Sequence, residues 1–257
     1  MEEKIFLRLF LPTGLIKPSS IILKEGFPID IALHYEEAGE GFPLILLHGN
    51  GEDLHYFQRQ IPIFSRKYRV IAVDTRGHGR SPRGTAPFTI DQFSEDLRCF
   101  MDQRGIQQAH LLGFSDGGNI ALTFALNHPA RIRSLILNGA NLFPRGVRLS
   151  AQMPVYLGYG ITALFAAGSP KARFKHELLG LMARQPHIDP AQLACLACPS
   201  LVIAGTRDLI KNRHTRLIAR ALPNASLAFV PGDHFIARGN AGAFNREILS
   251  FLEQNTR

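Results

Sequence analysis

Residues 109–118 read Ala-His-Leu-Leu-Gly-Phe-Ser-Asp-Gly-Gly, an apolar run that passes directly into a sharp turn. Within this stretch Gly113, Ser115 and Gly117 match the pattern G-x-S-x-G, and residues 116–127 continue with helical periodicity. A serine on so tight a turn between strand and helix brings neighbouring backbone close, which leaves no room for side chains at the flanking glycines. The stretch therefore predicts a buried strand that ends in a nucleophilic Ser115.

Similar short apolar runs recur along the chain without hydrophobic–polar alternation, as expected of strands that helices cover on both faces. They are residues 44–47, 70–73, 109–113, 135–137, 201–204 and 227–230. Longer amphipathic stretches separate them, and these predict helices at residues 53–66, 90–104, 116–127, 213–221 and 242–255. The alternation predicts an α/β fold with a mostly parallel central sheet flanked by helices. Residues 21–36 are expected to add one or two antiparallel edge strands.

The alternation of strands and helices stops between residues 142 and 194, where no strand is apparent and prolines separate apolar helical stretches. We interpret residues 142–194 as an inserted helical cap, with residues 1–141 and 195–257 forming one core. The apolar side chains of Tyr156, Leu157, Tyr159, Leu164 and Phe165 could either line a pocket under this cap or pack against the core.

The composition is that of a globular protein, with 257 residues, 46% apolar and 19% charged. Three cysteines and an N-terminus without a basic signal sequence favour a cytoplasmic protein. Residues 149–170 are uncharged but contain Pro, Ser and Gly, so no membrane span is expected. The net charge of +8 comes without a nucleic-acid-binding motif, and no nucleic acid is expected as a partner. Cys195 and Cys198 are interpreted as small core residues, and the oligomeric state stays open.

A serine hydroxyl becomes a good nucleophile only when a histidine takes its proton and a carboxylate orients that imidazole. Behind a nucleophile elbow these partners follow in the chain order serine, acid, histidine. Asp208 follows the apolar run 201–204, and His234 follows the run 227–230. The carboxyl ends of such strands gather catalytic loops at one edge of the sheet, so Ser115, Asp208 and His234 are predicted to meet there.

A tetrahedral intermediate also needs hydrogen-bond donors for its oxyanion. One is expected to be the backbone N–H of Asp116, directly after the nucleophile, and the other the backbone N–H of Asn50 in the loop 48–51. A single preorganised donor of this kind lowers the barrier by about 2.7–4 kcal/mol. No cofactor and no metal are expected.

These motifs stand in the order of a known family. From about Ile31 onward the sequence resembles capped α/β-hydrolase fold enzymes of the esterase and lipase-like branch, through the loop 48–51, residues 74–81, the elbow, Asp208 and residues 232–234. The resemblance implies a carboxylesterase-like serine hydrolase that cleaves a small ester, thioester or lactone through an acyl-enzyme. Residues 115–118 are similar to the elbow of amino-acid-ester hydrolases, in which the acid after the serine can bind a substrate ammonium. The alternative for the Asp116 carboxylate is that it merely stabilises the helix N-terminus.

Two other readings of the whole chain stay open. The same three side chains can serve carbon–carbon bond cleavage, amide hydrolysis or perhydrolysis, which the sequence does not separate. The fold could also act as a non-catalytic binding module, because a fold does not dictate a function.

Overall fold

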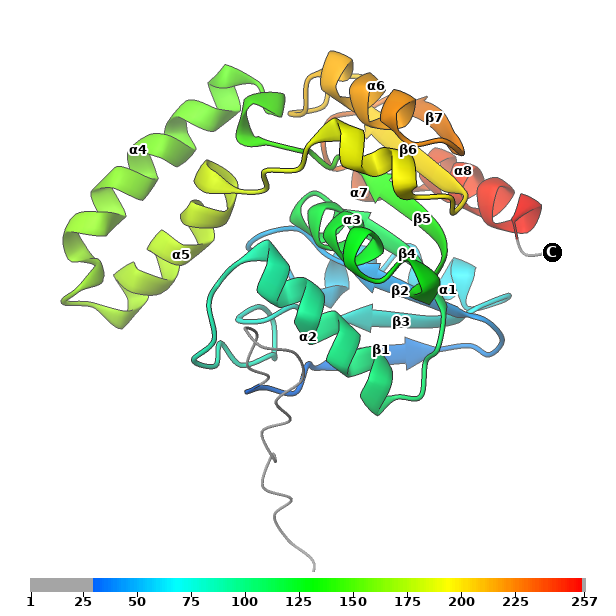
Figure 1. The fold of residues 1–257 in the computed structure, drawn as a ribbon, viewed down its shortest axis with the longest axis horizontal. Helices are drawn as coiled ribbons and strands as arrows, with labels where there is room; N and C mark the ends of the chain where they lie inside the picture. Colours follow the sequence, from blue (N-terminus) through cyan, green and yellow to red (C-terminus); the bar gives the residue numbers. More distant parts are fainter. Residues whose placement is uncertain (1–29, 256–257) are drawn as a thin grey trace, which may run out of the picture.

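The computed structural model describes residues 30–255, which form a seven-stranded sheet between layers of helices (Figure 1). The strand order is β1-β3-β2-β4-β5-β6-β7; β1 is antiparallel to β3, and all other neighbours are parallel. The strands are β1 (Tyr35–Ala38), β2 (Pro43–Leu47), β3 (Arg69–Val73), β4 (Ala109–Phe114), β5 (Ile132–Asn138), β6 (Ser200–Gly205) and β7 (Ala225–Val230). The predicted α/β class and mostly parallel sheet are confirmed.

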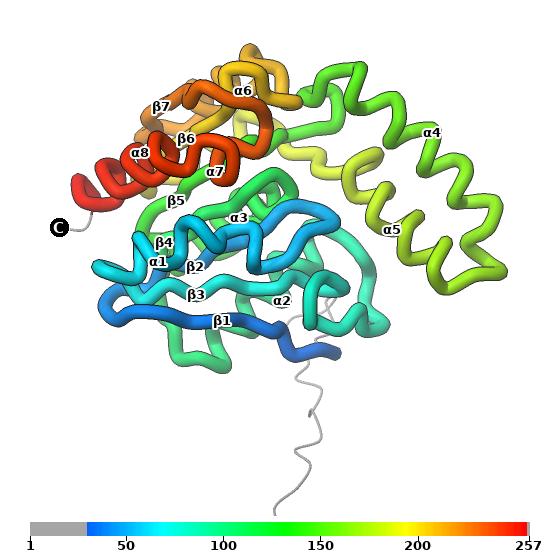
Figure 2. The backbone as a smooth tube through the Cα atoms, turned by 180° about the vertical axis from the view of Figure 1, so that it is seen from behind, coloured from blue at the N-terminus to red at the C-terminus, as the bar shows by residue number. Residues whose placement is uncertain are grey.

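Helices cover both faces of this sheet, which explains why its strands lack alternation. On one face lie α2 (Ile90–Gln103), α3 (Asp116–Asn127) and α6 (Asn212–Ala221), and on the other lie α1 (Ile61–Phe64), α7 (Ile236–Gly239) and α8 (Ala241–Gln254) (Figures 1 and 2). In β2, Ile45 and Leu47 pack into the first layer, whereas Leu44 and Leu46 pack into the second. All four side chains are buried, so both sides of the strand need apolar residues.

Two predicted elements were wrong in extent. The helix expected over residues 53–66 is instead a 3-10 turn, η1 (Leu54–Phe57), followed by the single turn α1. Pro62 stands in the first turn of α1, and because it has no backbone N–H it cannot continue a helix that began earlier. Of the strands expected over residues 21–36, only β1 is present in the described part, and it extends to Ala38. Residues 21–29 lie outside the described residues.

The segment between β5 and β6 is helical, with η3 (Pro144–Gly146), α4 (Leu149–Ala166), α5 (Pro170–Arg184) and η4 (Pro190–Cys195). We call α4 and α5 together the α4–α5 hairpin; the two helices pack along each other and project from the body of the molecule (Figures 1 and 2). Its root is tied to the core, where Val147 forms an isolated antiparallel bridge with Ile210 after β6. In the part of the chain from residue 30 to 255, no helix has the length and apolarity that crossing a bilayer requires.

Candidate active site

Ser115 lies on the turn between β4 and α3 in a strained backbone conformation. Its φ is +52° and its ψ is −118°, and it is the only non-glycine residue with positive φ among residues 30–255. The strain is built in by close packing: a side chain at Gly113 would overlap the carbonyl of Gly117, and one at Gly117 would overlap the carbonyl of Leu47. Strain of this kind persists only where the surroundings over-determine it, and it is concentrated at functional sites.

The structure brings Ser115, His234 and Asp208 together at the carboxyl edge of the sheet. His234 Nε2 lies 3.0 Å from Ser115 Oγ, and His234 Nδ1 lies 2.6 Å from Asp208 Oδ1. A carboxylate accepts, so Nδ1 carries the proton and Nε2 is free to accept from the serine hydroxyl. Asp208 is completely buried, and its carboxylate also accepts the backbone N–H groups of Ile210 and Gly205. The imidazole is therefore held in the tautomer that general-base catalysis needs.

Gly139 at the end of β5 is a residue of this site that the sequence reading missed. It has φ +62°, and a Cβ atom there would lie 2.7 Å from His234 Cε1. The His234 ring thus occupies the space that a side chain at position 139 would take. The available signal was a glycine two residues after the predicted strand 135–137. The reason for the glycine depends on a histidine far along the chain.

The loop after β2 lies against the nucleophile. A Cβ atom at Gly49 would be 3.3 Å from Ser115 Cβ, and Glu52 N–H donates to Gly49 O at 3.2 Å to close a turn with Gly51 at φ +74°. Asn50 sits inside this turn. Asp116 is the first residue of α3, where a backbone N–H has no acceptor within its own helix. The two predicted oxyanion donors thus belong to segments that flank Ser115.

His48 braces that loop. Its Nε2 accepts the backbone N–H of Thr75 at 3.0 Å, so its Nδ1–H donates to Gly49 O at 2.7 Å. Burial, reinforced by the nearby His78, lowers the pKa of His48 to about 4. The imidazole therefore stays neutral and supports the loop as a fixed donor–acceptor pair.

The Asp116 carboxyl group is buried beside the nucleophile, with 7% of the residue exposed. Its Oδ1 accepts from Asn119 Nδ2 at 3.1 Å, whereas Oδ2 has no hydrogen-bond partner among the described residues. Burial raises the pKa of Asp116 to about 6, although Asn50, Asn119 and His234 all act in the opposite direction. An ionised Asp116 is thus an incompletely compensated charge.

A second carboxyl group that the sequence reading missed lies near His234. Glu52 Oε1 pairs with Arg238 Nη1 at 3.2 Å, and burial raises the pKa of Glu52 while His234 and Arg238 oppose the rise. The Arg238 guanidinium also lies over the ring of Tyr56, which stacks on Phe114 with ring centroids 4.2 Å apart. Charge and aromatic packing therefore support the elbow from the side of α7.

The root of the α4–α5 hairpin is bonded to the loop that carries the acid. Arg148 Nε donates to the backbone carbonyl of Asp208 at 2.7 Å, and Arg148 N–H donates to Leu209 O at 2.8 Å. Further out, Asn50 Nδ2 donates to Leu178 O on α5 at 2.7 Å. The hairpin thus contacts both the acid loop and the predicted oxyanion loop.

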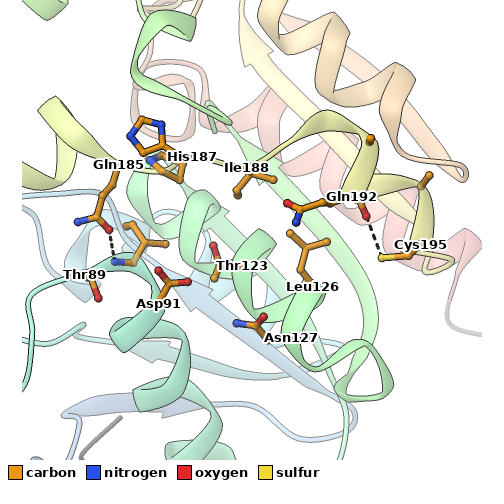
Figure 3. A pocket seen from close by; sticks show the side chains of 14 residues that line it. Thr89, Asp91, Thr123, Leu126, Asn127, Gln185, His187, Ile188, Gln192 and Cys195 are labelled. Carbon is orange, nitrogen blue, oxygen red and sulfur yellow. Dashed lines mark hydrogen bonds between the residues drawn. The ribbon is translucent and has the colours of Figure 1, made fainter. Parts of the chain in front are cut away.

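A cavity of about 960 Å³ is shown in Figure 3. Thr123, Leu126 and Asn127, near the end of α3, line it, whereas Ser115 precedes the start of that helix. Its lining combines polar and apolar residues: Thr89, Ile90, Asp91, Thr123, Leu126, Asn127, Gln185, Pro186, His187, Ile188, Ala191, Gln192, Ala194 and Cys195. None of the three predicted catalytic residues belongs to that lining. Within residues 30–255, no cluster of three or more His, Cys, Asp or Glu side chains could hold a metal ion.

Two expectations about side-chain burial were wrong. Leu157, Leu164 and Phe165 are 62%, 79% and 60% exposed, so they do not pack against the core, because α4 presents that side to the outside. Cys195 is exposed and Cys198 is half-buried, because Cys195 ends the surface turn η4 and Cys198 lies in the short connection between η4 and β6. Tyr156 lines a smaller cavity with Arg145 and Ala183, and Tyr159 lines another with Phe88 and His176.

Comparison with known proteins gives one consistent family. Residues 43–167 match the family described as the alpha/beta hydrolase fold. The chain is 26% identical over 253 residues to 3-oxoadipate enol-lactonase 2 of Acinetobacter baylyi (strain ATCC 33305 / BD413 / ADP1), covering 88% of this chain and 94% of that protein. It is 29% identical over 249 residues to the serine hydrolase BPHL of Mus musculus, covering 87% and 84%.

A solved structure is similar to this chain in both sequence and fold. The structure of a hydrolase from Pseudomonas aeruginosa PA01 superposes with a TM-score of 0.73 at 28% identity, covering 91% of this chain and 97% of that one. Similarity therefore extends over most of the chain.

Proposed function

The chain belongs to the α/β-hydrolase superfamily, and on that basis we propose that it is a serine hydrolase that cleaves a small carboxylic ester, thioester or lactone through an acyl-enzyme. The observation that carries this proposal is the contact of Ser115 Oγ, 3.0 Å from an imidazole whose other nitrogen lies 2.6 Å from a buried carboxylate. The named activity of the enol-lactonase relative supports a lactone among the substrates.

In the first half-reaction Ser115 Oγ attacks the carbonyl carbon while its proton passes to His234 Nε2. The negative charge that develops on the carbonyl oxygen is stabilised by the backbone N–H groups of Asn50 and Asp116. Asp208 stabilises the imidazolium without taking its proton. The intermediate then collapses, and His234 donates the proton to the leaving oxygen or sulfur, which leaves an ester on Ser115.

In the second half-reaction His234 Nε2 takes a proton from water, and the resulting hydroxide attacks the acyl carbon. The same two N–H groups hold the second tetrahedral intermediate, and its collapse returns the proton to Ser115 Oγ. In a lactone the leaving oxygen stays attached to the acyl chain, so a single hydroxy acid is released. Residues 142–194 are proposed to act as the cap over this site in a cytoplasmic enzyme.

The test is turnover of a short aryl ester, p-nitrophenyl acetate, by the parent and by Ser115→Ala. We expect the substitution to remove turnover without unfolding the protein, because only the nucleophile is lost. Ser250→Ala, an exposed serine on α8, is the matched control and should keep the parent rate. Similar rates in the parent and in Ser115→Ala would refute the proposal.

A second proposal concerns the substrate of the same site. The buried Oδ2 of Asp116 lacks a partner among the described residues, so a substrate ammonium that reached it would supply the missing hydrogen bond and charge. We expect hydrolysis of an amino-acid ester to exceed that of its N-acetylated form, and Asp116→Asn to abolish the difference. Equal rates for the two esters in the parent would contradict the ammonium role but leave the serine mechanism intact.

A substrate panel separates the remaining reactions that the triad can perform. An enol-forming diketone, an amide and hydrogen peroxide with a carboxylic acid represent carbon–carbon cleavage, amide hydrolysis and perhydrolysis. Faster consumption of any of these than of every ester and lactone would replace the ester proposal while keeping the three catalytic residues.

A further inference from the structure

One side of α4 is an exposed apolar surface. Its members recur every three or four residues, so they lie on one side of the helix, and each is at least 40% exposed. We call them the apolar stripe: Leu149, Met153, Leu157, Ile161, Leu164 and Phe165. The most exposed, Leu164 at 79%, lies two residues before the end of α4 and so near the tip of the α4–α5 hairpin. Tyr156, which is 40% exposed, borders the stripe on the side of α5.

The opposite side of α4 is where α5 packs. There the Tyr159 ring stacks on His176 of α5 with centroids 4.2 Å apart, and Thr162 Oγ1 lies 3.2 Å from His176 Nδ1. Only Gln152 of α4 is buried. A helix on the outside of a globular protein normally turns charged residues outward, whereas residues 149–170 contain none. A continuous exposed surface of this kind marks an interaction site.

Positive charge borders the stripe at both ends. Lys171, Arg173 and Lys175 are exposed on the first turns of α5, next to the hairpin tip. Arg145 and Arg148 lie at the root. Between residues 145 and 188 the only acidic residue is Glu177, and it is already paired with Arg83 at 2.7 Å. The surface therefore combines apolar side chains with cations that have no acidic counterpart in the hairpin.

We propose that the α4–α5 hairpin docks on an anionic membrane surface. The apolar stripe would enter the boundary between head groups and acyl chains, and the flanking cations would contact lipid phosphates. A second copy of this chain fits less well. Pairing two stripes in either direction brings basic ends together, whereas an anionic lipid surface complements both ends at once.

This mode of binding is peripheral and independent of the reaction at Ser115. Helix α4 lies along the surface rather than through it, which agrees with the lack of a spanning helix among residues 30–255. Since the hairpin root is bonded to the Asp208 loop, docking would place the site close to the lipid surface. Binding and catalysis can be measured separately.

The experiment is co-sedimentation of the full chain with vesicles of phosphatidylcholine alone or of phosphatidylcholine mixed with phosphatidylglycerol. We expect at least about tenfold tighter binding to the anionic vesicles, weakening as salt rises. The double variant Leu164→Glu, Phe165→Glu should lose at least about tenfold in affinity, because two exposed apolar anchors are removed. Both positions are exposed, so the fold should survive, as circular dichroism can check.

A charge-matched pair separates a local site from the overall positive charge. Lys171→Gln with Lys175→Gln should weaken binding by about tenfold. Arg213→Gln with Arg220→Gln makes the same change in net charge on α6 and should leave binding near the parent value. Equal losses in the two pairs, or no binding of the parent to anionic vesicles, would overturn the proposal. A parent dimer in light scattering that Leu157→Glu dissociates, without vesicle binding, would assign the stripe to a second copy.

Discussion

The loops at the carboxyl edge of the sheet and the α4–α5 hairpin differ in how tightly they are held. Around Ser115 the predicted catalytic side chains hydrogen-bond to one another, Asp208 and His234 are buried, and the backbone approaches so closely that Gly113, Gly117 and Gly139 tolerate no side chain. In the hairpin, α4 packs on α5, leaves a whole side exposed, and buries Gln152 alone. The sheet edge around Ser115 therefore permits only one arrangement of its side chains, whereas the exposed side of α4 is held by few contacts.

This difference separates two requirements of an enzyme. Catalytic geometry tolerates little displacement, since a misplacement of about 1 Å can cost about 100-fold in rate. Recognition of different partners and substrates tolerates variation in the segments that connect the strands. The contrast predicts that substitutions at the sheet edge change turnover, whereas substitutions on the exposed side of the hairpin change binding only.

The largest expected effect comes from Asp208→Asn, which keeps the shape of the acid but can reverse the tautomer of His234. We expect kcat to fall by about 10⁴-fold with the fold retained. The matched control, Asp189→Asn, changes an exposed aspartate at the start of η4 and should leave kcat unchanged. Turnover of Asp208→Asn within tenfold of the parent would contradict the role of the buried acid.

The buried, incompletely compensated carboxyl group of Asp116 should make the free energy of unfolding depend on pH. Its pKa is raised from 3.8 to about 6, so the folded state holds the proton more tightly than the unfolded state. The stabilisation from this proton is present below about pH 4 and is lost as pH rises through about 6, by about 3 kcal/mol in all. Asp116→Asn should therefore raise the free energy of unfolding at pH 7.5 relative to the parent, and the gain should vanish near pH 4.

Urea unfolding at both pH values measures this effect. Asp91→Asn is the control, because Asp91 is an exposed aspartate in the first turn of α2. We expect it to keep the pH dependence of the parent. If Asp116→Asn also kept that dependence unchanged, the carboxyl would be better compensated than the structure indicates.

Gly139→Ala tests whether the sheet edge really permits one geometry. The new methyl group would meet the His234 ring, and we expect kcat to fall by about 100-fold. Gly105→Ala is a close match, since Gly105 has φ +65° against +62° for Gly139 but has nothing within 4 Å of the added Cβ. Both variants should lose about 1–2 kcal/mol of stability from the backbone, and only Gly139→Ala should lose activity. Equal activities would show that the imidazole has room to move.

Arg148→Met tests the hydrogen bond that joins the root of the α4–α5 hairpin to the Asp208 loop, and it has the smallest expected effect. Loss of the donor to the Asp208 carbonyl should lower kcat by about tenfold and leave KM unchanged, because the acid loop loses one charged hydrogen bond. Arg145→Met, an exposed arginine close by, should change neither constant. A rise in KM alone would show that Arg148 acts on substrate entry rather than on the position of the acid.

Much of the fold could be predicted because β2 to β6 are buried on both faces, which gives each of them a run of apolar residues. The edge strand β1 has exposed Glu36 and Glu37 and lacks this signal. The positions of Ser115, Asp208 and His234 followed from the strands β4, β6 and β7, since each residue lies within four positions of the end of one of them. Because the carboxyl ends of parallel strands lie at the same edge of the sheet, residues that follow different strands come close together there. The structure accordingly brings these three side chains together.

The remaining features depend on contacts that local sequence does not encode. Pro62 interrupts the predicted helix 53–66, and this signal in the sequence was not used in the prediction. The apolar residues of α4 looked like core or pocket, because composition cannot tell which side of a helix meets a neighbour. Gly139 and Glu52 matter only because His234 arrives beside them from a distant part of the chain.

The most direct test of the central claim, that Ser115 is an activated nucleophile, is intact-mass analysis after exposure to a fluorophosphonate. The probe needs an activated serine and no knowledge of the substrate. We predict one adduct on the parent and none on Ser115→Ala. No adduct on the folded parent, or an adduct that persists in Ser115→Ala, would contradict the account and favour a binding module with an inactive site.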